Sequence, residues 1–242
     1  MTIQGNTLKL TQMKLSGMLR SYESFLESKV ITDLDNHEML AHLLDAEWDD
    51  RYNRKLDRLL KKAKLRYNAS LEEIDYKENR GLSKNAIAKL TDGTWIKKGE
   101  NIIISGSTGV GKSFLACAIG NQACHQGFKV MYFSCLKLFH FLKMSKGDGS
   151  YIKEINQLKS QDLIILDDFA MEKMDSISRL SLFEILEDRS GIKSTMITSQ
   201  LPPNTWHEVI GEKTIADAVC DRIVNSANYI KLKGESLRKQ KK

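Results

Sequence analysis

Apolar residues recur at steps of three and four near the start of the chain, a spacing that places them on one face of a helix. The first stripe predicts a helix over 8–27, and its members are Leu15, Met18, Leu19, Tyr22, Phe25 and Leu26. The second runs without Gly or Pro over 36–66, and its members are Leu40, Leu44, Trp48, Tyr52, Leu56, Leu59, Leu60 and Ala63. Packing within the protein is the simplest use of the first stripe, with a surface for a partner helix as the alternative. Residues 1–68 are therefore expected to form a small all-helical N-terminal domain.

The hydrophobic pattern changes near residue 100, where short apolar runs replace the helical spacing. Ile102, Ile103 and Ile104 form a wholly apolar, β-branched run, which is typical of a strand buried in a parallel sheet. Further strands are predicted over 129–134, 163–168 and 194–198, and helices over 114–126 and 177–188. This alternation favours an α/β fold over 69–242, a doubly wound and mostly parallel sheet flanked by helices. An additional strand between those at 102–104 and 163–168 would distinguish this sheet from that of simple nucleotide kinases.

The composition indicates a folded protein, because 41% of the 242 residues are hydrophobic and 28% are charged. No apolar run approaches the roughly 18 residues of a membrane span, and the first residues do not have the pattern of a signal peptide. We therefore expect a cytoplasmic protein with no membrane partner. The absence of HExxH argues against a zinc hydrolase. The four cysteines show no metal-binding spacing and are expected to be reduced, mostly buried thiols. They are Cys117, Cys124, Cys135 and Cys220.

The positive charge of the chain is concentrated in the second half of the predicted 36–66 helix. The whole chain carries 37 − 31 = +6, whereas residues 51–68 alone hold eight Lys and Arg against Asp57, or 8 − 1 = +7. Six of these cations fall within an arc of about 120° on a helical wheel. A one-sided cationic ridge suits the phosphate backbone of double-stranded DNA, and an ordinary solvated helix face is the alternative. The predicted DNA-binding residues are Arg51, Arg54, Lys55, Arg58, Lys61, Lys62 and Arg66.

The segment directly after the 102–104 strand matches the phosphate-binding pattern GxxxxGK[ST]. Its glycines let backbone N–H groups approach phosphate oxygens, and the helix that follows points its positive end at the same anion. Lys112 is expected to reach the β- and γ-phosphates of ATP, and the hydroxyl of Ser113 to ligate Mg²⁺. The predicted ATP-binding residues are Gly106, Ser107, Thr108, Gly109, Val110, Gly111, Lys112, Ser113 and Phe114.

Two carboxylates end the apolar 163–168 strand, at the edge of the sheet where ligands bind in open α/β folds. Asp167 is expected to join the Mg²⁺ shell with Ser113, and Asp168 to polarise the attacking water. A solvated strand end is the alternative use of an isolated acidic pair. Gln200, or alternatively Ser199, follows the 194–198 strand and would lie between the phosphate loop and the acids, where it could sense the γ-phosphate.

Five segments resemble, in order, those of IstB-type helper ATPases of insertion sequences, which are relatives of DnaC helicase loaders and DnaA initiators in the AAA+ class. They are GENIIISGSTGVGKSFLACAIG, LIILDDF, STMITSQLPPNTWHEVIGE, IADAVCDRI and IKLKGESLRK. The resemblance covers nearly the whole chain. It implies that Asp167 and Asp168 are the Walker B pair and that Gln200 is sensor 1. It also implies that Arg222 is an arginine finger acting on a neighbouring subunit.

The same resemblance implies an extra helical element over 136–158 that lines a nucleic-acid channel, and Arg238 as a candidate second sensor. Only 242 − 222 = 20 residues follow Arg222, so no C-terminal lid domain is expected. Asp168 stands where many ATPases carry Glu. Its shorter side chain would place the water less favourably, so slow intrinsic turnover, raised by DNA or a partner, is expected.

These features together predict a Mg²⁺-dependent AAA+ ATPase that forms homo-oligomers on double-stranded DNA through ATP-bridged interfaces. Its expected role is to help the transposase of the same element select or capture target DNA. The closest alternative is a DnaC-like helicase loader, which would use its N-terminal domain to grip a helicase. A P-loop kinase and a DNA-binding protein with an inert ATPase are more distant alternatives.

Overall fold

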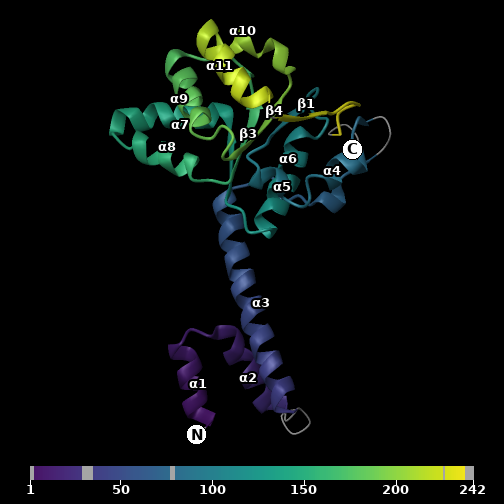
Figure 1. Ribbon diagram of the computed structural model, residues 1–242, viewed down its shortest axis with the longest axis vertical. Coiled ribbons are helices and arrows are strands. Elements are labelled where there is room, and N and C mark those ends of the chain that lie inside the picture. The colour runs from purple at the N-terminus through teal and green to yellow at the C-terminus, as the bar shows by residue number, and fades with distance from the viewer. Residues whose placement is uncertain (1–2, 29–34, 77–79, 226, 238–242) are drawn as a thin grey trace. The chain divides into compact units, whose positions relative to one another are not determined.

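The computed structural model describes residues 3–28, 35–76, 80–225 and 227–237 (Figure 1). It divides into two compact units, with the boundary in the chain between Arg58 and Leu59. The sequence placed this boundary after residue 68. The residues between these two positions group with the second unit, where Ala63 is fully buried and the Ala69 carbonyl accepts a hydrogen bond of 2.8 Å from the Asn121 side chain.

The first unit is helical, but its helices differ from the predicted ones at two points. The described helices are α1 (Ile3–Gln12), α2 (Ser16–Ser28) and α3 (Asn36–Ala63), the last of which crosses the unit boundary. The single helix predicted over 8–27 is wrong, because the chain turns at Lys14, which has a left-handed φ of 58°. The helix predicted to reach Arg66 ends at Ala63, and Lys64 after it has a φ of 50°. The wheel position assigned to Arg66 is therefore wrong.

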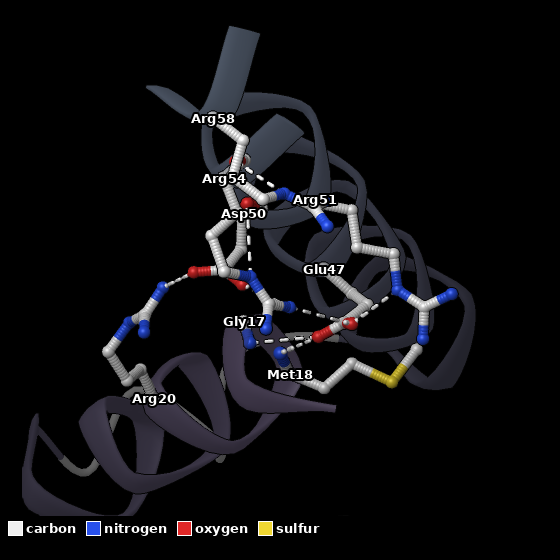
Figure 2. Close-up of polar contacts among 8 residues, drawn as sticks. All are labelled: Gly17, Met18, Arg20, Glu47, Asp50, Arg51, Arg54 and Arg58. Carbon is white, nitrogen blue, oxygen red and sulfur yellow. Dashed lines mark hydrogen bonds and ion pairs between the residues drawn. The ribbon is translucent and has the colours of Figure 1, made fainter. Parts of the chain in front are cut away.

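Glu47 of α3 joins α2 to α3 in the first unit. Its carboxylate accepts hydrogen bonds from the backbone N–H groups of Gly17, at 2.8 Å, and Met18, at 3.3 Å, in the first turn of α2 (Figure 2). Gly17 permits this approach, since a Cβ there would lie 2.2 Å from the Ala46 carbonyl oxygen. Burial raises the pKa of Glu47, but hydrogen bonds from Arg51 and the two N–H groups outweigh burial and hold this pKa below its usual value.

Replacing Glu47 with glutamine is expected to lower the free energy of unfolding of the first unit by about 1 to 3 kcal/mol, because a neutral amide is a weaker acceptor for the two N–H groups. The stabilisation that the ionised Glu47 carboxylate gives the wild type should be present above about pH 4.5. It should be lost as the pH falls through the lowered folded-state pKa of Glu47. Hydrogen exchange of the α2 amides at several pH values measures both effects. Asp49→Asn, on an exposed position of the same helix, is the control. Equal protection of α2 in the two variants would contradict this role of Glu47.

The apolar stripe of α3 is exposed along its first half. Leu40, Leu44, Trp48 and Tyr52 are all exposed, and Trp48 is 76% accessible. Among the described residues, no helix combines the length and apolar character needed to span a membrane.

The second unit is an α/β domain built on one sheet, which has five strands in the part of the chain that the structure describes. These strands are β1 (Asn101–Ser105), β2 (Val130–Ser134), β3 (Leu163–Phe169), β4 (Ser194–Ser199) and β5 (Ala227–Lys231). The helical segments are η2 (Leu71–Glu73), α4 (Lys84–Ala88), α5 (Thr94–Lys97), α6 (Lys112–His125), α7 (Cys135–Asp148), α8 (Tyr151–Lys159), α9 (Ser176–Glu187), η4 (Pro203–Thr205), α10 (Trp206–Ile210) and α11 (Lys213–Val224).

The strands are parallel and follow the order β2-β3-β4-β1-β5. The four strands predicted from the sequence are confirmed, and β4 is the additional strand between β1 and β3. The edge strand β5 was not predicted, because only Ile230 among its residues is buried. Since all the strands run in the same direction, the segments that follow β1, β3 and β4 emerge at one edge of the sheet.

Helices cover both faces of this sheet (Figure 1). α6 packs closely on one face, where a Cβ at Gly120 would lie 2.7 Å from the side chain of Ile165. On the other face, Ile103, Ile164 and Ile197 belong to a buried cluster with residues of α7 to α11. The helical element expected over 136–158 consists of α7 and α8.

A fully buried arginine connects several segments at the amino-terminal edge of the sheet through hydrogen bonds. Arg189 is 1% exposed, and its guanidinium donates to the carbonyls of Leu158 and Gln161, at 2.9 and 2.8 Å, and to that of Ser194. Burial lowers the pKa of Arg189 to about 10, so it stays charged at neutral pH. One side chain thus fixes the end of α8, the entry to β3 and the start of β4.

Candidate functional site

The predicted phosphate loop connects β1 to α6. Gly109 and Gly111 have left-handed φ values of 85° and 97°, conformations that favour glycine. Gly111 is the N-cap of α6, so the positive end of this helix lies at the loop. Lys112 is buried, and its ammonium donates to the carbonyls of Gly106, at 2.8 Å, and Ser107, at 3.0 Å. The loop and the helix therefore form the anion-binding arrangement expected for this pattern.

Asp167 at the end of β3 is joined directly to the first turn of α6. Its Oδ1 accepts a hydrogen bond of 2.9 Å from the Ser113 hydroxyl and another from Thr198 of β4. Its Oδ2 accepts from Tyr132 of β2 and, at 3.4 Å, from Arg66. Asp167 has no exposed surface. The structure thus brings Ser113 and Asp167, the two predicted Mg²⁺ ligands, together.

Asp168 lies beside Asp167 but outside the regular strand ladder. The pairing of β3 with β4 shifts between Leu166 and Phe169, and Asp168 adopts a left-handed φ of 58°, an uncommon conformation for a residue with a side chain. Its N–H donates to the Thr198 hydroxyl at 3.1 Å, and its side chain is 33% exposed. It also lines a cavity of about 110 Å³ between α7 and α9. The carboxylate of Asp168 is therefore partly exposed at this edge of the sheet.

Gln200, directly after β4, contacts the phosphate loop. Its Oε1 accepts a hydrogen bond of 2.8 Å from Thr108, and its Nε2 lies 3.0 Å from the sulfur of Met171, just beyond the acidic pair. Ser199, the alternative sensor, is buried, and its hydroxyl donates to the Phe169 carbonyl at 2.9 Å. Gln200 is therefore the better placed of the two.

Arg222 lies on α11 and pairs with residues of α9. Its guanidinium forms an ion pair with Glu187 and lies 4.9 Å from the centre of the Phe183 ring. Its role as a finger stays a prediction. Arg238 lies outside the described residues.

Some of the cations of α3 pair with carboxylates, and others are exposed. Arg51 pairs with Glu47 at 2.6 Å and Arg54 with Asp50 at 2.6 Å, and Asp50 also pairs with Arg20 (Figure 2). The Arg58 side chain donates to the Arg54 carbonyl at 3.1 Å. Lys55, Arg58, Lys61 and Lys62 are exposed.

Four contacts of this site were missed from the sequence. Tyr132 and Thr198 lie in predicted strands, but only the strand order shows that β2 and β4 flank β3. Burial, followed by the hydrogen bond to Asp167, raises the pKa of Tyr132, so its phenol remains a donor. Arg66 was assigned to DNA, whereas its guanidinium faces the acidic pair. Arg80 donates to the Val110 carbonyl of the phosphate loop at 2.6 Å, and no sequence pattern marks it.

The donor set fits ATP with Mg²⁺. A hydroxyl and a carboxylate, 2.9 Å apart, are the hard oxygen ligands that Mg²⁺ prefers. The helix N-terminus and the lysine beside them suit a polyphosphate. The carboxylate of Asp168 provides an acceptor for a water at the same edge of the sheet.

Comparison with known proteins identifies the family. The family model described as IstB-like ATP binding protein matches residues 8–242. The chain belongs to this family. An insertion sequence ATP-binding protein of Sinorhizobium fredii is 44% identical to this IstB-like chain over 234 residues, which are 97% of the chain and 96% of the relative. The ATP-binding protein of insertion sequence IS1162 from Pseudomonas fluorescens is 39% identical, over 85% of this chain and 89% of the relative.

Solved structures show the fold of the IstB-like chain. The DnaC helicase loader has a TM-score of 0.56 at 22% identity, and the match covers 69% of this chain and 98% of DnaC. DnaI has a TM-score of 0.61 at 24% identity, over 68% of this chain and 91% of DnaI. The second unit therefore has the P-loop AAA+ fold expected from the sequence.

Proposed function

We propose that this IstB-like chain is a Mg²⁺-dependent ATPase that assembles on double-stranded DNA and helps the transposase of its insertion sequence capture target DNA. The observation that carries the ATPase assignment is the 2.9 Å hydrogen bond between Ser113 and Asp167, which joins the phosphate loop to the acidic strand. The similarity to ATP-binding proteins of insertion sequences, over 97% and 85% of the chain for the two relatives, supports the transposition role.

Each residue of the site has a separate role in ATP hydrolysis. Lys112 and the first N–H groups of α6 bind and orient the phosphates, and Ser113 with Asp167 holds Mg²⁺. When bound, Mg²⁺ supplies positive charge that neutralises the charge developing on the phosphate oxygens. Asp168 accepts a hydrogen bond from the attacking water, and Gln200 donates from its amide to the γ-phosphate. The shorter reach of Asp168 relative to Glu keeps turnover of the isolated protein slow.

Arg222 completes the site of a neighbouring subunit in this proposal. A guanidinium placed near the γ-phosphate from a second subunit makes assembly depend on ATP, since it finds its partner only when the triphosphate is present. In the structure the guanidinium of Arg222 is held by the ion pair with Glu187 of α9 and by a hydrogen bond of 2.9 Å to the Ala218 carbonyl of α11. Hydrolysis removes the contact and loosens the assembly.

The basic part of α3 is the proposed DNA-binding surface. Lys55, Arg58, Lys61 and Lys62 are exposed and pair with no carboxylate among the residues that the structure describes, so they can neutralise phosphates. Arg51 and Arg54 contribute less because Glu47 and Asp50 already neutralise them.

Replacing both Lys61 and Lys62 with alanine is expected to weaken binding to double-stranded DNA of any sequence. The slope of log K against log salt concentration should become shallower by about 2, one phosphate contact for each lysine. Fluorescence anisotropy with labelled duplex at several salt concentrations, with a non-hydrolysable ATP analogue, measures the slope. The matched control is Lys89→Ala with Lys97→Ala, which removes two exposed lysines from the second unit. Equal slopes in the two double variants would contradict the proposed surface.

Electron microscopy on long duplex, with and without a non-hydrolysable ATP analogue, tests the proposed function directly. Ordered assemblies should form only with the nucleotide, and Arg222→Ala should abolish them. Coating of duplex to the same extent without nucleotide would contradict the proposal. Pull-down with a transposase of the same insertion sequence, compared with a replicative helicase, separates transposition from helicase loading.

A further inference from the structure

One guanidinium reaches both carboxylates of the acidic pair. Nη1 of Arg66 lies 3.4 Å from Oδ2 of Asp167 and 3.6 Å from Oδ2 of Asp168. The three residues belong to the same unit. Arg66 is therefore an internal counter-ion of the pair that the proposed function assigns to Mg²⁺ and to the attacking water.

The segment around Arg66 is fixed against the helix of the phosphate loop. The left-handed turn at Lys64 ends α3, and the Tyr67 ring lies 5.4 Å from the Arg66 guanidinium and 6.3 Å from the Phe114 ring on α6. The side chain of Arg66 is nevertheless 43% exposed. Its backbone is held in place while its charged group can change partner.

The oxygens of Asp167 are fully used in this arrangement. Oδ1 accepts from Ser113 and Thr198, and Oδ2 accepts from Tyr132 and Arg66. A carboxylate has about four acceptor positions, so a cation that approaches Asp167 must displace one of the four donors. Thr198 and Tyr132 are buried, and Ser113 is itself a ligand in the proposed site. Arg66 makes the longest of these contacts and is the donor that can leave.

We infer that Arg66 is a positioning residue which competes with Mg²⁺ for the acidic pair. The inference rests on the proposed function and adds a specific property to it. The guanidinium holds Asp167 and Asp168 together in the absence of nucleotide, and it would have to release Asp167 for that carboxylate to hold Mg²⁺. Because the two cations exclude each other, Arg66 raises the Mg²⁺ concentration that nucleotide binding requires.

Titration with MgCl₂ at a fixed concentration of a fluorescent ATP analogue, in the absence of DNA, tests this competition on the full chain. Arg66→Ala is expected to lower the half-saturating Mg²⁺ concentration about two- to fivefold, the size of a partly exposed ion pair. Arg66→Lys, which keeps the charge but presents one ammonium, should fall between Arg66→Ala and the wild type. Lys64→Asn is the control, since it removes an equal charge two residues away and asparagine tolerates a left-handed φ. It should leave the Mg²⁺ dependence unchanged.

Binding of Mn²⁺ followed by electron paramagnetic resonance, with ADP present, gives a second readout that does not depend on hydrolysis. The half-saturating Mn²⁺ concentration should rank the variants in the same order as the MgCl₂ titration does. A half-saturating concentration that is unchanged or higher in Arg66→Ala and Arg66→Lys would overturn the inference, because a purely supporting role would impair metal binding. Failure of the wild type to bind the analogue at saturating Mg²⁺ would instead contradict the proposed function.

Discussion

Replacing Asp167 with asparagine is expected to slow ATP hydrolysis by at least about 100-fold, or about 3 kcal/mol in activation free energy. The amide keeps the size of the side chain but removes the negative charge that would hold Mg²⁺ beside Ser113. It also presents an NH₂ group to hydroxyls that now donate to Asp167. Phosphate release at saturating ATP measures the loss, and thermal unfolding shows whether the variant remains folded.

Two further variants make this result specific. Asp57→Asn makes the same chemical change at an exposed position of α3 and should hydrolyse ATP like the wild type. Asp168→Asn should also slow hydrolysis but retain Mg²⁺-dependent nucleotide binding, because Asp168 acts on the water. A folded Asp167→Asn variant with wild-type turnover would refute the assignment of the acidic pair.

Replacing Arg189 with methionine is expected to destabilise the second unit by about 3 to 5 kcal/mol. The apolar side chain fills much of the same space but leaves buried carbonyls of Leu158, Gln161 and Ser194 without their charged donor. These carbonyls belong to three segments, so losing their hydrogen bonds to Arg189 destabilises α8, β3 and β4 together. Chemical denaturation followed by circular dichroism measures the change.

Arg189→Lys distinguishes the role of the charge from that of the fork-shaped guanidinium. One ammonium can reach fewer of these carbonyls, so this variant should lie between methionine and the wild type. Lys193→Met, which removes a partly exposed cation nearby, is the control and should lower the free energy of unfolding by less. A stability of Arg189→Met within about 1 kcal/mol of the wild type would contradict the structural role given to this arginine.

The central sheet could be predicted from the sequence because its strands are buried on both faces and read as continuous apolar runs. Ile102, Ile103 and Ile104 illustrate this, since all three are buried. The edge strand β5 offers no such run. The break at Lys14 and the end of α3 at Ala63 carry neither glycine nor proline, so local composition does not mark them.

The parts of the site that follow from a local pattern were predictable, namely the phosphate loop and the acidic strand end. The contacts of Tyr132, Thr198 and Arg66 with Asp167 depend on the order of the strands and on where α3 stops. Periodicity placed Arg66 on a helical ridge for DNA. The left-handed residue two positions earlier turns it toward the acids instead.

The four cysteines have a practical consequence for experiments on this protein. Cys117, Cys124, Cys135 and Cys220 are all buried and free, and burial raises the pKa of each, in Cys124 to about 12. A thiol reacts through its thiolate, so these side chains should be almost inert toward maleimides in the folded state. A single cysteine introduced on the surface of α3 could therefore carry a fluorophore or spin label without first removing the native ones.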